Sequence, residues 1–233
     1  MEKPTTCFFC EKELIQQKKV ALQTCIYCGK VCSVDLLCPD GHFYCQSCQT
    51  KSTQDLISDY CLSSKSRNPI ETATVIMKFP EFKMHCPEHH FLVPAVLLSA
   101  YCRTKKKTSK LKEWLKAAQN RAEKVPGAFC GTHGSCGAAV GSGIFISLIT
   151  KATPLKSIEW NLANSMTGRS LLRMAPYGGP RCCKRVTFLA IQETADFLSE
   201  RMGVLIDVPN EIHCEFSHKN EQCLQNNCPF YFN

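Results

Sequence analysis

The sequence lacks any apolar run long enough to span a bilayer. Its longest, Ala138–Ile149, falls well short of the roughly 20 apolar residues that a membrane helix needs. The first residues, MEKPTTCFFCEKEL, also lack the apolar segment of a secretory signal. These absences exclude a membrane protein from consideration, and we expect a cytoplasmic protein in a reducing compartment.

Cysteine, by contrast, is abundant, at 18 of 233 residues. Either a disulfide scaffold or metal binding accounts for so high a content. Disulfide scaffolds are typically short secreted chains without enough core, whereas this chain is long enough for one medium domain and a small module. The cysteines are therefore predicted mostly to bind metal.

The patterning predicts a mainly α-helical protein in three parts. These are an N-terminal zinc-binding module of knuckles and short β-hairpins (1–50), a helical connector (51–84) and an α-helical body rich in cysteine and histidine (85–233). The body is expected to end in an irregular, cysteine-rich tail from residue 213. No internal repeat is evident.

Several helix boundaries can be placed from the sequence. Asn68 followed by Pro69, and Pro87 followed by Glu88, are typical of helix starts. An amphipathic helix is predicted around 108–124, and three more helices at about 136–151, 154–173 and 183–202. Gly203 is expected to end the last helix and to precede a short strand.

Four ligand pairs in the first fifty residues predict two zinc ions. Two Cys-x2-Cys knuckles make one closed tetrahedral site, and the predicted ligands are Cys7, Cys10, Cys25, Cys28, Cys38, His42, Cys45 and Cys48. If the pairs interleave, the first pair joins the third and the second joins the fourth. A separate site within 38–48 is the alternative, although it needs a very tight loop. Cys32 has no pair, and the module is expected to unfold without metal.

The stretch FCGTHGSCGAAVGSGIF (129–145) is compatible with a metal site, a reactive thiol or the tight start of a buried helix. Cys130, His133 and Cys136 precede a helix whose N-terminus would lower a thiol pKa. Gly141 and Gly143 destabilise that helix unless they allow close packing against another one, so close packing is predicted there.

Seven cysteines in three loops of the body suggest an iron–sulfur cluster, with additional zinc or free buried thiols as alternatives. They are Cys130, Cys136, Cys182, Cys183, Cys214, Cys223 and Cys228. The acid/base candidates are His85, Glu88, His89 and His133. The pattern His85-x-x-Glu88-His89 formally matches an inverted zinc-protease motif, but Pro87 interrupts the helix that this motif requires. Capping with buried, hydrogen-bonded histidines is the alternative to a pocket role.

The strings MHCPEHHFLVPAVLLSAY, VPGAFCGTHGSCGAAVGSGIF, ATPL, GGPRCCKR and CPFY resemble an uncharacterised cysteine-rich family of anaerobic prokaryotes. Some relatives in that family carry a methyltransferase domain, but no methyltransferase glycine motif occurs here. Separately, the piece GHFYCQSC resembles part of RING-type cross-brace modules, although Cys38 lies farther from His42 than that pattern requires. The family resemblance implies a coherent domain and agrees with the expected cytoplasmic compartment. It implies no reaction.

Two functions are compatible with these features. The first is a metalloenzyme or metal/sulfur-handling protein that acts on a small molecule or a partner protein. If three cysteines hold a cubane cluster, its fourth iron can act as a Lewis acid. The alternative is a non-catalytic zinc-binding adaptor that contacts RNA or a protein through the segment 103–124, which carries +7 of the net charge of +8. No aromatic platform for base stacking interleaves those charges, so a solvated surface also explains them.

Overall fold

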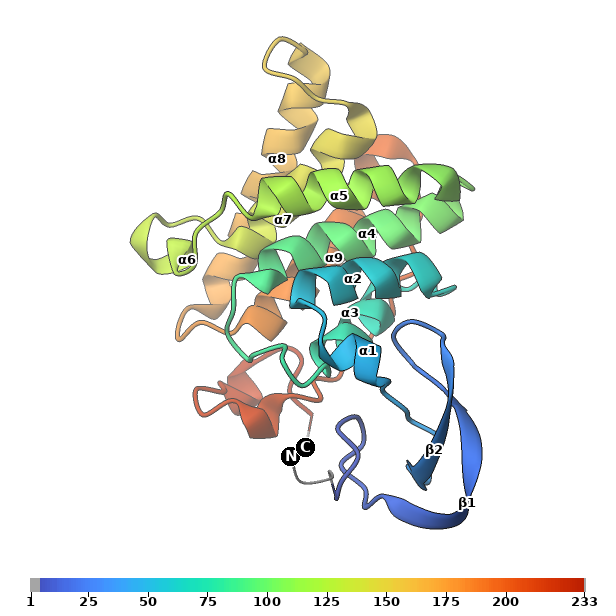
Figure 1. Cartoon of the computed structure of the whole chain (residues 1–233). Helices are drawn as coiled ribbons and strands as arrows, with labels where there is room; N and C mark the ends of the chain where they lie inside the picture. The colour runs from blue at the N-terminus through green and yellow to red at the C-terminus, as the bar shows by residue number, and fades with distance from the viewer. Residues whose placement is uncertain (1–4, 233) are drawn as a thin grey trace.

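The computed structural model describes residues 5–232, so that the first four residues of the predicted module and Asn233 lie outside it. The protein is mainly α-helical, as predicted, with one small β-hairpin near the N-terminus (Figure 1). Strand β1 (Ile15–Thr24) pairs antiparallel with β2 (Val31–Leu37), and a register shift interrupts the ladder between Gln16 and Ala21.

The helices follow one another along the rest of the chain. They are α1 (Gln46–Gln49), α2 (Thr53–Ser63), α3 (Pro69–Met77), α4 (Glu88–Thr104), α5 (Leu111–Ala122), α6 (Phe129–Thr132), α7 (Gly137–Thr150), α8 (Ser157–Met174) and α9 (Cys183–Met202). Residues 5–232 also contain short 3-10 turns: η1 (Thr108–Lys110) and η2 (Ala175–Tyr177) lie between helices, and η3 (Ser217–Lys219) and η4 (Gln225–Asn227) follow α9. The predicted start of α3 is confirmed, because Asn68 Oδ1 accepts from the N–H groups of Ile70 and Glu71.

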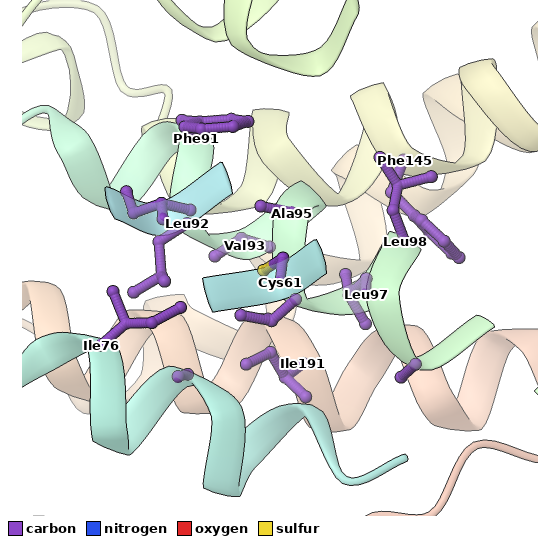
Figure 2. Packing of buried hydrophobic residues seen from close by; sticks show 14 of the residues in the cluster. Cys61, Ile76, Phe91, Leu92, Val93, Ala95, Leu97, Leu98, Phe145 and Ile191 are labelled. Atoms are coloured by element: carbon purple, nitrogen blue, oxygen red, sulfur yellow. The ribbon is translucent and has the colours of Figure 1, made fainter. Parts of the chain in front are cut away.

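Helix α4 forms the centre of the core. Every residue from Phe91 to Cys102 is buried, because α2, α3, α5, α7 and α9 pack around it. Figure 2 shows Leu92, Val93 and Leu97 of α4 among side chains from the neighbouring helices. A helix that is apolar all round can be stable only in such an enclosed position.

Helix α7 lies unusually close to both α4 and α8, as its glycines predict. A Cβ atom at Gly141 would lie 2.9 Å from the His90 carbonyl oxygen and 2.9 Å from Pro94 Cδ. A Cβ atom at Gly143 would lie 2.0 Å from Thr167 Oγ1. These two positions therefore accept only glycine without a shift of the neighbouring helices.

The prediction of a short strand after Gly203 is wrong. Gly203 does end α9, with φ +60°, but residues 204–210 form no strand. Val204 and Ile206 are buried while Leu205 is exposed, so that the segment has a strand-like alternation of burial. It lacks the neighbouring strand that a ladder requires, because β1 and β2 pair only with each other.

The tail, residues 204–232, returns to the N-terminal module (residues 5–50), which is drawn in blue in Figure 1 while the tail is drawn in red. Lys219 Nζ lies 2.7 Å from Glu11 Oε1, and Lys78 joins Glu215 of the tail at 2.6 Å. Among the helices of residues 5–232, none combines the length and apolar character that a membrane crossing requires.

Candidate metal centres

The N-terminal module holds two groups of four side chains that could each bind a metal ion. The first tetrad is Cys7, Cys10, Cys38 and His42, and the second tetrad is Cys25, Cys28, Cys45 and Cys48. In each, all four ligand atoms lie within 4.8 Å of one another. The grouping is the interleaved pairing that the sequence favoured, and Cys32 belongs to neither tetrad.

The spacing within the tetrads fits a single tetrahedral ion. A zinc–sulfur bond of about 2.3 Å implies sulfur–sulfur edges of about 3.8 Å in a regular tetrahedron. The Sγ atoms of Cys10 and Cys38 are 3.5 Å apart, and those of Cys28 and Cys45 are 3.6 Å apart. Nδ1 of His42 lies 3.4 Å from Cys38 Sγ. Each tetrad thus matches one ion without rearrangement.

The charge states of two ligands also suit a metal ion. Burial lowers the pKa of His42 below its ordinary value, which keeps the imidazole neutral and able to coordinate. Burial alone would raise the pKa of Cys45, but hydrogen bonds from the Ser47 hydroxyl and from the backbone N–H of Cys48 outweigh it and lower that pKa to about 6. At least one thiolate is therefore available in the second tetrad at neutral pH.

Aromatic side chains fasten the module to the helices. Tyr27 is fully buried, and its ring centroid lies 5.4 Å from those of both Tyr44 and Phe79. Phe79 follows α3 directly, so that this cluster joins the knuckles to the helical core. Offset and edge-to-face ring pairs of this kind add about 1 kcal/mol each beyond burial.

A cavity of about 590 Å³ lies in the body, where the N-termini of three long helices meet. Pro87 caps α4, Cys136 caps α7 and Cys182 caps α9, and all three residues line the cavity. Each helix N-terminus carries a partial positive charge and free N–H groups. The cavity therefore favours an anionic occupant.

Each of these helix N-termini brings a cysteine to the cavity wall. Cys86 precedes the cap of α4, Cys136 is the cap of α7, and Cys183 is the first residue of α9. Burial raises the pKa of Cys86 to about 12 and that of Cys183 to about 11. The Cys136 thiol also has a raised pKa because of burial. Burial thus favours the protonated thiol, whereas a bound metal cation would favour the thiolate.

Polar atoms beside the cavity lack partners among the described residues. His89 is 1% exposed, and its Nε2 accepts or donates no hydrogen bond, while its Nδ1 lies 3.0 Å from the Cys86 carbonyl oxygen and 3.3 Å from Cys86 Sγ. His85 Nδ1 and Glu88 Oε2 are likewise buried and unpaired. A buried polar group without a partner costs roughly 1–3 kcal/mol, so these atoms indicate a ligand that completes the site.

The structure brings some of the predicted site residues together and separates others. His85, His89, Cys130, Cys136, Cys182 and Cys183 all line the cavity. His133 does not; its ring is exposed and stacks on Phe129 at 4.1 Å. The protease-like pattern is not on one helix, because α4 begins at Glu88 and leaves His85 outside it. His85 Nε2 instead lies 3.3 Å from Asn220 Oδ1.

Two residues that the sequence reasoning missed are central to the site. Cys86 lines the cavity, and the signal for it was the Cys-Pro pair at a helix start, the same pair that marks Cys228. Lys184 is 1% exposed, and its ammonium lies 4.5 Å from the Phe82 ring centroid and 5.2 Å from that of Phe216. Within residues 5–232 no carboxylate pairs with Lys184, and the largest charge effects on it come from thiols, including those of Cys86 and Cys183.

The other predicted cysteines gather at the junction of α9 and the tail, where Cys182 joins them. Cys182, Cys214, Cys223 and Cys228 line one small hollow together with apolar side chains such as Met84 and Phe230. Burial, with smaller contributions from negative charge on Cys182, Cys228 and Cys223, raises the pKa of Cys214 to about 11. These four residues are called the tail cysteine group below.

The basic segment 103–124 is only partly available to a partner. The Arg103 guanidinium donates to the carbonyl oxygens of Cys61 (3.0 Å) and Ser64 at the C-terminal end of α2, so that it caps a helix. The lysines from Lys105 to Lys110 are exposed.

A family model described as "Family of unknown function (DUF5714)" matches residues 57–231, and because that range is most of the chain, the protein belongs to this family. No curated protein and no solved structure matches the chain. The matched range contains the cavity and the tail cysteine group, but it begins after Cys48 and contains neither tetrad. The features that the family shares are therefore to be sought in the body.

Proposed function

We propose that this member of the family is a metalloenzyme whose body binds an iron–sulfur cluster in the 590 Å³ cavity, and whose N-terminal module binds two zinc ions. The observation that supports the cluster best is the meeting of three helix N-termini, each with a cysteine at the wall. Cys86, Cys136 and Cys183 are the proposed ligands.

The electrostatics of the cavity favour such a group. A cluster held by thiolates is anionic overall, and the three helix N-termini, Arg181 and Arg185 supply positive charge at the cavity wall. Among the described residues no carboxylate lines the cavity itself, and the nearby Glu88 carboxylate lies behind the wall with Oε2 buried. An all-apolar ligand would leave the positive ends of the three helices at the cavity wall without compensation, which is the costlier arrangement.

Three protein ligands leave one iron of a four-iron cluster without a cysteine, and the chemistry that such an iron supplies is Lewis-acid activation of a substrate hydroxyl or thiol. The residues of the chain then have separate tasks. Arg181 lines the same cavity and is placed to bind an anionic substrate group. His89 Nε2, buried and unpaired, is placed to hold or accept a proton.

Zinc suits the module better than iron for a geometric reason. Its tetrads have ligand atoms at the edges of a tetrahedron around one ion, with no room for sulfide between them. Each tetrad is closed, with four protein ligands, as structural zinc sites are. We assign these ions a structural role.

The test is metal and sulfide content together with a visible absorption spectrum, on full-length protein purified without oxygen. We expect about two zinc ions per chain, plus iron and acid-labile sulfide with a broad visible band. Cys136→Ser and Cys183→Ser are expected to lose iron from the cavity and to keep both zinc ions. Cys32→Ser is the matched control, because Cys32 lies outside every group described here.

A colourless wild-type protein that holds zinc alone would refute the cluster. Full iron content in both cavity variants would refute the assignment of its ligands.

A further inference from the structure

The tail cysteine group has the features of a second, separate metal centre, and nothing in the proposed function requires it. Cys182 reaches it from the cap of α9, whereas Cys214, Cys223 and Cys228 come from the irregular tail. The neighbouring residue Cys183 lines only the larger cavity. Cys182 therefore lies between the two hollows and lines both, whereas Cys183 belongs to the cavity alone.

Backbone N–H groups already point at three of these four sulfurs. The N–H groups of Phe216 and Gln225 donate to Cys214 Sγ and Cys223 Sγ, each at 3.4 Å, and that of Arg185 donates to Cys182 Sγ at 3.5 Å. The same bond from residue i+2 occurs in the first tetrad, where Phe9 N–H donates to Cys7 Sγ at 3.4 Å. Such bonds stabilise a thiolate, the form in which sulfur binds metal.

Buried positive charge provides an independent indication. Lys184 is 1% exposed and lies near Cys182 and Cys214 as well as near the cavity thiols. Arg185 is 4% exposed, and its guanidinium donates to the Gly178 and Pro180 carbonyl oxygens. The Lys184 ammonium donates to the Lys83 carbonyl oxygen at 3.3 Å, but neither cation is paired with a carboxylate in residues 5–232, so an anionic partner beside them is favourable. A metal–thiolate centre is such a partner.

The spacing of the sulfurs distinguishes this group from the tetrads. The tetrads are the groups in residues 5–232 whose ligand atoms all lie within 4.8 Å of one another, and no three members of the tail group meet that limit. A single zinc ion holds four thiolates as close as the tetrads do. A four-iron cluster places iron and sulfide between the thiolates, so it holds them farther apart.

The buried packing of the irregular tail also indicates a cross-link to the body. Beyond α9 the chain has no regular structure except the one-turn segments η3 and η4, yet Phe216 and Phe230 are buried. Phe230 packs edge-to-face on Phe188 of α9 at 5.4 Å, and its carbonyl oxygen accepts from Cys214 N–H at 2.7 Å. A metal that joins Cys182 of α9 to three tail cysteines would fasten this segment to the body.

We propose that Cys182, Cys214, Cys223 and Cys228 bind a four-iron iron–sulfur cluster with four cysteine ligands, distinct from the cluster in the large cavity. All of its irons have protein ligands, so it offers no open position to a substrate. The centre fastens the tail across the N-terminus of α9.

The experiment compares iron, sulfide and zinc content in full-length variants reconstituted without oxygen with iron and sulfide. Cys214→Ser and Cys223→Ser are expected to lose about four irons per chain relative to wild type. Cys136→Ser is expected to retain that iron, and Cys32→Ser to match wild type. Unchanged iron in both tail variants, or the loss of zinc in place of iron, overturns the proposal.

The two proposals fail in different ways. If Cys136→Ser keeps all its iron while Cys214→Ser loses about four, the cavity cluster is wrong and the tail cluster stands. The opposite pattern leaves only the cavity cluster.

Amide hydrogen exchange on wild-type protein covers the case in which the tail variants fail to fold. Protection of the N–H groups of Phe216 and Gln225 is expected to rise when iron and sulfide are supplied. Equal protection with and without iron overturns the proposal.

Discussion

Replacing Lys184 by methionine tests the charge argument directly, because the substitution has opposite effects on the metal-free and the iron-loaded protein. Burial lowers the pKa of the Lys184 ammonium from 10.5 to about 8. Since one pKa unit corresponds to about 1.36 kcal/mol, keeping this side chain charged costs the folded metal-free protein about 3 kcal/mol at pH 7. Methionine removes that cost and fills a similar volume.

Part of the gain is offset by lost contacts. The ammonium lies over the rings of Phe82 and Phe216, at 4.5 and 5.2 Å from their centroids. Each cation–π contact contributes about 0.5–1 kcal/mol, although a methionine sulfur recovers some of this against the same rings. The metal-free Lys184→Met variant is therefore expected to be about 1–2 kcal/mol more stable than wild type in urea unfolding at pH 7.

The pH dependence of the metal-free wild type follows from the same residue. Because the folded-state pKa is lowered, the cost is fully present below about pH 8 and disappears as pH rises toward 10.5. The unfolded chain binds more protons than the folded one in that window, so the contribution of Lys184 to the free energy of unfolding increases with pH there. The Lys184→Met variant should lack this increase.

In the iron-loaded protein the effect of the Lys184→Met substitution should reverse, from stabilising to destabilising. The clusters are anionic, so Lys184 then stabilises them, and the variant is expected to lose iron faster to a chelator than wild type does. Lys83→Met is the matched control, because Lys83 is exposed and carries the same charge nearby. A variant that is less stable without metal and retains its iron as well as wild type would refute the idea that Lys184 compensates bound negative charge.

Further substitutions test the packing and the tetrads. Gly143→Ala should destabilise the protein by about 2 kcal/mol, because its Cβ would meet Thr167 Oγ1 at 2.0 Å, whereas Gly168→Ala, with nothing within 4 Å, should be neutral or stabilising in the same urea titration. Arg169→Met should cost about 2 kcal/mol, because it leaves the buried carboxylate of Glu193 with only the longer contact to Arg173 at 3.4 Å; equal stability would show that the pair is not needed. Cys28→Ser should bind one zinc ion fewer than Cys32→Ser by elemental analysis, and equal zinc in the two variants would contradict the second tetrad.

The helices and the knuckles could be predicted because their signals are local. Asn68 before Pro69 marks a cap within three residues, and Cys-x2-Cys spacing fixes two ligands within one turn of chain. Even the proximity of α7 to its neighbours could be inferred, because Gly141 and Gly143 would otherwise only weaken a helix. The expected strand after Gly203 failed for the opposite reason. Strand formation depends on a partner elsewhere in the chain, and the alternation of burial at Val204–Ile206 does not reveal whether one exists.

The division of the body cysteines could not be predicted from spacing. Cys182 and Cys183 are adjacent in sequence, yet only Cys182 joins the tail group, because α9 begins between them and directs successive residues to different sides. Cys86 was missed because it lacks a second cysteine at knuckle spacing. Its partners, Cys136 and Cys183, lie far along the chain and approach it only when α4, α7 and α9 pack together.

The same packing explains why the cavity is electropositive without a cluster of lysines at its wall. Three helices can present their N-termini to one cavity only if they pack against one another and begin at the same level. Because Gly141 has no side chain, α7 can approach α4 closely at Pro94. Each N-terminus carries roughly half an elementary positive charge. The three together, with the buried cations Lys184 and Arg185, would balance about the charge of the two proposed clusters. The folded core, and not the cysteine spacing, therefore decides which cysteines face each of the two proposed sites.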